Sequence, residues 1–187
     1  LGLYWDRVVG GVWQEHQGLG AVASQAHASE LVRFPLLLLF KALFGLSGVR
    51  YAYAFLMLLA GPLGVYFLLK NTFFVGSKGN SANFGAFLGG LFYLLNLGTL
   101  QHFHVPLEMF LTHFGILPWA FLAAIQYLRK NTRSNLLSFS LISLFLYSQA
   151  HTPTLFYAYF MAIIVFFGTI LIRDLISKNP ARSAKRV

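Results

Sequence analysis

The sequence predicts an all-α membrane protein, a polytopic transmembrane helical bundle of about five spans with an amphipathic helix at its outer surface. Hydrophobic residues make up 57% of the 187 residues and charged residues only 10%, whereas an average soluble domain has about 25% charged residues. A single soluble core of this size cannot bury so much apolar surface, and disorder requires the opposite composition. Long apolar runs separated by short polar segments complete the prediction.

The remaining composition excludes several kinds of function. The chain has no cysteine, which excludes disulfides, thiolate metal sites and cysteine nucleophiles. Its formal net charge is +9, from 14 Lys and Arg against 5 Asp and Glu. These bases lie between apolar runs and not on one face of a soluble domain, so we expect them to hold connections in the cytoplasm, and we expect no nucleic-acid partner.

Five segments approach the roughly 20 helical residues that a hydrocarbon core about 30 Å thick requires. They cover residues 51–69, 84–100, about 106–128, 136–150 and 155–172. The second is rich in glycine, and its Gly85-x3-Gly89 pattern predicts close helix packing. The fourth is short. Residues 1–49 are therefore predicted to be an extracytoplasmic loop, and residues 50–187 a transmembrane bundle that ends in a basic cytoplasmic tail.

The segment SELVRFPLLLLFKALFGL, residues 29–46, differs from the five spans. Its continuous apolar run, Phe34–Phe40, is short and is flanked by Arg33 and Lys41. Pro35 is tolerated in the first turn of a helix. We expect an amphipathic helix that lies in the outer membrane interface, with a short re-entrant segment as the alternative.

Lysine and arginine are distributed asymmetrically along this topology. The connections 70–83 and 129–135 and the tail after residue 172 hold ten of the 14 bases, while the connections 101–105 and 151–154 hold none. With five spans the basic segments share one side, which the positive-inside rule makes cytoplasmic. The N-terminal segment then faces outward. Because residue 1 is Leu and no signal peptide precedes it, we expect an upstream span and a larger polytopic protein.

The acid–base residues gather on the opposite, outer side. Four of the five carboxylates map there, namely Asp6, Glu15, Glu30 and Glu108, together with His16, His27, His102, His104 and His151. Ionisable groups close to membrane depth indicate a functional site. The alternative is that they are ordinary loop residues.

The densest group lies in QHFHVPLE, residues 101–108. If the helix is continuous there, His104 and Glu108 share a face that Thr112 continues. With His102 they could bind a divalent metal, bind phosphate, or exchange protons with a substrate. Lining of a polar cavity, which Asn96 could also line, is the interpretation that we favour.

Several weak motifs together resemble one enzyme family. They are WQEHQGLGAVASQAHASELVRFPLLLLFKALFG, VRYAYAFLMLLAGPLGVYFLLK, GAFLGGLFYLLN and ILPWAFLAAIQYL. The chain resembles the N-terminal membrane portion of GT-C-type integral membrane glycosyltransferases, most closely the bacterial alpha-arabinofuranosyltransferase-like members. The resemblance implies transfer of a sugar from a polyprenyl-phosphate-linked donor to a hydroxyl of a glycan or lipid acceptor. The site would face the extracytoplasmic side of a prokaryotic plasma membrane.

The resemblance also implies roles for individual residues. A carboxylate of the first outer loop acts as catalytic base, and Asp6 is the nearest match, with Glu15 and Glu30 as the other candidates. The leaving phosphate requires a cation, which Arg33, Lys41 or a Mg²⁺ or Mn²⁺ ion held by His102, His104 and Glu108 could supply. Trp13 and His151 are the further candidates for substrate binding. No Asp-x-Asp motif occurs.

Two other classes of function stay open. The chain could be a segment of a lipid or solute transporter or flippase. Pro62 and Pro118 interrupt predicted spans, but no charge lies at depth, which counts against ion coupling. It could also be a non-catalytic membrane scaffold subunit whose outer histidines and acids are incidental.

Overall fold

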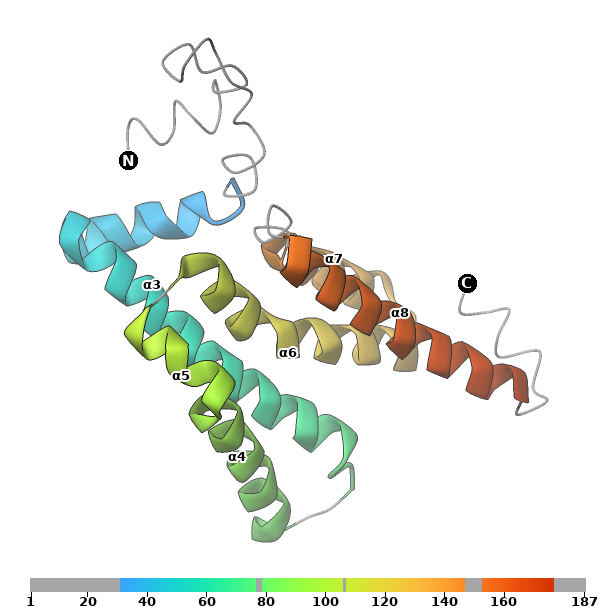
Figure 1. The fold of residues 1–187 in the computed structure, drawn as a ribbon. Helices are drawn as coiled ribbons and strands as arrows, with labels where there is room; N and C mark the ends of the chain where they lie inside the picture. Colours follow the sequence, from blue (N-terminus) through green and yellow to red (C-terminus); the bar gives the residue numbers. More distant parts are fainter. Residues whose placement is uncertain (1–30, 77–78, 106, 147–152, 177–187) are drawn as a thin grey trace.

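The computed structural model describes residues 31–76, 79–105, 107–146 and 153–176, and every regular element in these ranges is an α-helix (Figure 1). In chain order the helices are α3 (Phe34–Thr72), α4 (Asn80–Leu95), α5 (Leu97–His104), α6 (Glu108–Arg129), α7 (Arg133–Leu146) and α8 (Pro153–Ile176). The predicted all-α class is therefore confirmed. Within the described ranges, three helices are long and apolar enough to cross a membrane, namely α3, α6 and residues 154–172 of α8.

Helix α3 consists of two helices joined at Gly45. This residue has φ +68° and ψ 179°, a left-handed conformation that favours glycine. The residues before Gly45 run across the direction of the residues after it (Figure 1). The first part is helical over most of the segment 29–46, although the helix begins at Phe34, and its position in the membrane interface stays a prediction. The second part contains the predicted span 51–69.

The predicted span 84–100 is not one helix. Helix α4 ends at Leu95, and Asn96 adopts an extended conformation with ψ 160°. The Asn96 side-chain oxygen then accepts a hydrogen bond from the Thr99 amide at 3.0 Å, which caps the start of α5. The apolar composition across this region gave no sign of the break, because Asn96 stops one helix and starts the next by a local hydrogen bond. Helix α7 begins at Arg133, three residues before the predicted fourth span.

Helices α3 and α6 pack side by side and run in the same direction. Tyr53 contacts Thr112 near one end, the Trp119 indole donates to the Ala60 carbonyl at 2.9 Å in the middle, and Arg129 donates to the Asn71 carbonyl at 2.5 Å at the other end. Helix α4 runs back along α3, so that Gly90 lies against Pro62 and the Tyr66 hydroxyl reaches Asn83 at 3.5 Å. The chain therefore runs back along α3 in α4 before it enters α6, which again runs in the direction of α3.

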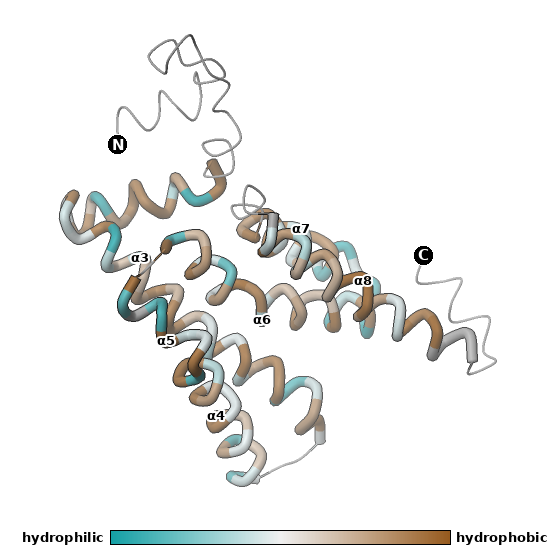
Figure 2. Tube along the Cα trace, viewed as in Figure 1, coloured by the Kyte–Doolittle hydropathy of each residue, from teal (hydrophilic) through white to brown (hydrophobic). Residues whose placement is uncertain are grey.

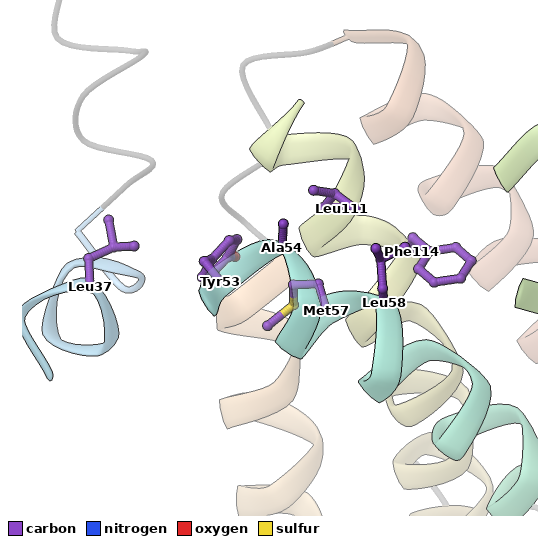
Figure 3. Packing of buried hydrophobic residues seen from close by; sticks show 7 residues of the cluster. All are labelled: Leu37, Tyr53, Ala54, Met57, Leu58, Leu111 and Phe114. Atoms are coloured by element: carbon purple, nitrogen blue, oxygen red, sulfur yellow. The ribbon is translucent and has the colours of Figure 1, made fainter. Parts of the chain in front are cut away.

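The core lies where α3 meets α6 (Figure 3). Its buried members are Leu37, Tyr53, Ala54, Met57 and Leu58 from α3, with Leu111 and Phe114 from α6. Glycines allow the close approach, because a Cβ on Gly61 would lie 2.7 Å from the Phe114 ring. Gly85 and Gly89 lie against the Phe74 ring and the Leu69 side chain, whereas the close backbone contact between α4 and α3 is at Gly90, so the predicted packing role of the Gly85-x3-Gly89 pattern stays a prediction.

The outside of the bundle is apolar. Phe92 is 75% exposed and Leu97 is 88% exposed, and none of the most apolar stretch of α8 is buried. Hydrophobic residues recur along α8 and along the first part of α3 (Figure 2). Soluble monomers rarely carry apolar patches of this extent. The exposed apolar helices fit a protein that is surrounded by lipid.

Candidate functional site: a charged cluster at one end of the bundle

Two arginines and one glutamate meet where the first part of α3, the second part of α3 and the start of α6 come together. We call Arg33, Arg50 and Glu108 the arginine–glutamate cluster. Arg33 Nη1 lies 2.7 Å from Glu108 Oε2, and Arg50 Nε lies 3.7 Å from Glu108 Oε1. The two positive charges exceed the one negative charge, so the cluster is formally cationic.

Local sequence explains how each member reaches the cluster. Arg33 is the N-cap of α3, directly before the first turn that contains Pro35. The turn at Gly45 changes the chain direction before Arg50. Glu108 occupies the first turn of α6, where a carboxylate interacts favourably with the helix dipole. The cluster therefore joins three separately positioned pieces of helix.

Burial differs sharply within the cluster. The Arg33 side chain is only 3% exposed, Glu108 is 31% exposed and Arg50 is 60% exposed. A buried guanidinium is costly unless it is paired, so the short contact with Glu108 holds Arg33 in place. Arg50 is the member that a ligand from outside can reach.

A hydrogen-bonded chain supports the cluster from within the helix interface. The Arg33 guanidinium carbon lies 5.3 Å from the Tyr53 ring centroid, a cation–π contact. The Tyr53 hydroxyl bonds to the Thr112 hydroxyl, which donates to the Glu108 carbonyl at 2.6 Å. Tyr53 and Thr112 are both fully buried. The charged cluster is thus connected to the α3–α6 core.

A cavity of about 360 Å³ opens beside the exposed side of the cluster. It is lined by Arg50, Leu107, Glu108, Met109 and Phe110. It combines a guanidinium and a carboxylate with apolar walls. Such a cavity suits an amphiphile that has a polar, anionic head, because guanidinium groups pair with phosphate through several hydrogen bonds.

The two histidines of the 101–108 segment have different surroundings. His102 is 8% exposed and its ring lies 5.9 Å from the Phe114 ring and 6.4 Å from the Phe110 ring. Burial lowers the pKa of His102 below its usual value, so its neutral form is favoured. His104 is exposed at the end of α5.

The continuous helix face that the spacing suggested for His104, Glu108 and Thr112 is absent. Helix α5 ends at His104 and α6 begins at Glu108, so His104 belongs to a different helix from the other two residues. Across the ranges that the structure describes, no three His, Asp or Glu side chains are grouped as a metal site requires. Glu108 instead contacts two arginines. Metal binding by His102, His104 and Glu108 stays a prediction.

The other predicted site residues are placed as follows. Lys41 is exposed on the first part of α3, and Arg33 is in the cluster. Asp6, Trp13, Glu15, Glu30 and His151 lie outside the described residues. The sequence analysis named neither Arg50 nor Tyr53 as a site residue. The signal available for Arg50 was its charge next to an apolar run, and nothing in the sequence linked it to Glu108.

Comparison with known proteins yields no relative from which a role could be transferred. No protein family, curated protein or solved structure matches the chain. The site therefore has to be interpreted from its own geometry.

Proposed function

We propose that this chain forms part of a GT-C-type membrane glycosyltransferase, in which the arginine–glutamate cluster receives the phosphate of a polyprenyl-phosphate-linked sugar donor. The observation that carries the proposal is the formally cationic cluster beside a cavity at one end of an apolar bundle. A lipid-linked donor requires apolar helices for its tail and a cation for its phosphate. The cavity beside Arg50 offers both a cationic side chain and apolar walls.

The two arginines of the cluster have different roles. Arg50 is exposed and contacts the donor phosphate, whereas Arg33 is buried and positions Glu108. Glu108 in turn orients the Arg50 guanidinium through the 3.7 Å contact. The catalytic base is a carboxylate of the N-terminal loop, Asp6, Glu15 or Glu30, which removes the proton from the acceptor hydroxyl.

We further propose that the chain crosses the bilayer five times. Two parallel helices of a membrane bundle require a crossing between them, and α4 with the first residues of α5 supplies it. Helix α4 has 16 residues, about 24 Å at 1.5 Å per residue, and α7 has 14 residues, about 21 Å. Both are short for a core of about 30 Å, so the break at Asn96 and local thinning of the bilayer accommodate them.

The same topology supports the side on which the cluster lies. Helix α6 separates Glu108 from Arg129 and Lys130 by its full 22 residues, about 33 Å. Lys70 lies in the last turn of α3, at the Arg129 end. By the positive-inside rule that end is cytoplasmic and the cluster faces the outside of a prokaryotic plasma membrane.

The test uses the complete protein in proteoliposomes with a polyprenyl-phosphate-linked arabinofuranose donor and an oligosaccharide acceptor. Arg50→Gln is expected to raise the KM for the donor at least tenfold, and Asp6→Ala to lower kcat. Lys130→Gln, at the opposite end of α6, is the matched control for loss of one exposed charge. Unchanged transfer in Asp6→Ala, Arg50→Gln and Glu108→Ala would refute the assignment of the site.

A lipid or solute transporter is the second candidate, and the broken helix at Asn96 favours it. Discontinuous helices expose backbone groups that bind substrates in many transporters. The two functions are distinguished by supplying labelled lipid-linked sugar to liposomes without an acceptor. Movement of the label across the bilayer without transfer would support the transporter.

A further inference from the structure

An apolar groove runs between α3 and α4, away from the arginine–glutamate cluster. It has a volume of about 360 Å³ and is lined by Pro62, Leu63 and Tyr66 from α3 and by Phe87, Gly90, Leu91 and Leu94 from α4. Leu63 is 52% exposed and Phe87 is 55% exposed, so the groove opens to the outside of the bundle. In a membrane protein this outside is hydrocarbon.

Close backbone contact forms the floor of the groove. A Cβ on Gly90 would lie 2.7 Å from the Pro62 carbonyl oxygen, so the two helices meet there with no side chain between them. The larger side chains that line the groove, among them Leu63, Phe87 and Leu91, surround this contact. The groove is therefore a consequence of how α3 and α4 pack, and it has apolar walls apart from the Tyr66 hydroxyl.

Polar groups mark one end of the groove. Lys70 lies one turn beyond Tyr66 on α3, and its Nζ is 5.6 Å from the centroid of the Tyr66 ring. Across from it, the Tyr66 hydroxyl donates to the Asn83 side-chain oxygen at 3.5 Å. Because α4 runs back along α3, Lys70 and Asn83 both lie at the end that also carries Arg129.

We propose that this groove binds an anionic phospholipid of the bilayer, with one acyl chain along α3 and α4 and the phosphate at Lys70 and Asn83. The distance from Pro62 to Lys70 along α3 is eight residues, roughly 12 Å, which is long enough for much of one acyl chain. The Lys70 ammonium at the end of a hydrocarbon-lined groove complements the negative charge of a phospholipid headgroup.

The basic end also favours this occupant over the polyprenyl-phosphate donor. That donor is assigned above to the opposite end of the bundle, where Arg50 lies. Cytoplasmic leaflets carry anionic lipids, and basic residues near the surface attract them. The lipid site does not depend on the glycosyltransferase activity, because it lies at the other end of α3 and involves other residues, although it rests on the proposed cytoplasmic position of that end.

The test measures which lipids stay bound to the protein. The complete protein is reconstituted with equal amounts of phosphatidylglycerol and phosphatidylcholine, extracted gently, and analysed by native mass spectrometry. One basic residue near the surface predicts about fivefold enrichment of phosphatidylglycerol. Lys70→Gln should abolish the enrichment. Lys130→Gln removes an exposed base at the same end, directly after α6, and should retain the enrichment.

A second pair of variants tests the groove itself. Leu63→Trp and Leu91→Trp fill it from α3 and from α4, and each should lower retention of both lipids while the protein elutes as the wild type does. The proposal is overturned if the wild type shows no preference for phosphatidylglycerol, if Lys130→Gln loses the preference as Lys70→Gln does, or if neither tryptophan variant changes retention. Displacement by polyprenyl phosphate but not by phosphatidylglycerol would also overturn it.

Discussion

Loss of Glu108 should destabilise the protein far more than loss of Arg50. In Glu108→Ala the Arg33 guanidinium, 3% exposed, loses its 2.7 Å partner and is left as a buried charge. Removing one member of a buried ion pair costs about 3–5 kcal/mol. Because Glu108 itself is 31% exposed, water can replace part of the lost interaction, and we expect about 3 kcal/mol.

Arg50→Gln provides the comparison within the same cluster. Its contact with Glu108 is longer, 3.7 Å, and the side chain is 60% exposed. Exposed ion pairs contribute only about 0–1 kcal/mol, so this variant should be close to the wild type in stability. The same two substitutions therefore separate a structural effect from the loss of phosphate binding expected for Arg50.

The assay is reversible unfolding in mixed micelles, followed by the fluorescence of the three tryptophans. A double variant, Arg33→Met with Glu108→Leu, should recover most of the stability lost in Glu108→Ala, because neither charge of the pair then remains in the buried site. Two results would refute the reasoning. One is an equal loss in Glu108→Ala and Arg50→Gln, and the other is a double variant no more stable than Glu108→Ala.

Three further predictions follow from the same contacts. The chain has no cysteine, so Leu107→Cys and Lys130→Cys can be labelled individually with an impermeant maleimide. Leu107→Cys should react only from the outside and Lys130→Cys only from the cytoplasmic side, because α6 separates the two positions. Labelling of both from the same side would refute the topology. Gly61→Leu should destabilise the α3–α6 contact by about 1–3 kcal/mol in the unfolding assay, because its Cβ would lie 2.7 Å from the Phe114 ring, whereas Gly168→Ala, with nothing within 4 Å, should have little effect. Burial lowers the pKa of His102, so the unfolded chain binds a proton first as the pH falls through about 6.5, and stability should decrease from there downward; His102→Phe should reduce this loss, and an unchanged pH dependence would contradict it.

The helical elements were largely predictable because apolar composition determines which segments can cross a membrane. The segments 51–69, about 106–128 and 155–172 all lie within or nearly within observed helices. The break at Asn96 was not predictable from composition. It depends on a side chain that stops one helix and caps the next, which is a local hydrogen bond and not a change in hydropathy.

The candidate site was predictable only in part. Glu108 was a candidate because it lies with His102 and His104 in the polar segment 101–108, and Arg33 was one because the family resemblance implies a cation for the donor phosphate. Their pairing was not apparent, since residues 33 and 108 are far apart in the chain and meet only after α3 and α6 pack. The i, i+4 spacing of His104 and Glu108 predicted a shared helix face. This prediction was wrong, because one helix ends at His104 and the next begins at Glu108.

The sequence alone determined that the chain is helical, apolar on its outside and basic at alternate connections, because these properties depend on the residue types in each short segment. Only the tertiary structure decided that α3 and α6 run in the same direction and that two arginines share one glutamate at their beginning. The reason is physical. Hydropathy acts within a segment, whereas the pairing of charges and the opening of a groove depend on how closely glycines allow separate helices to approach.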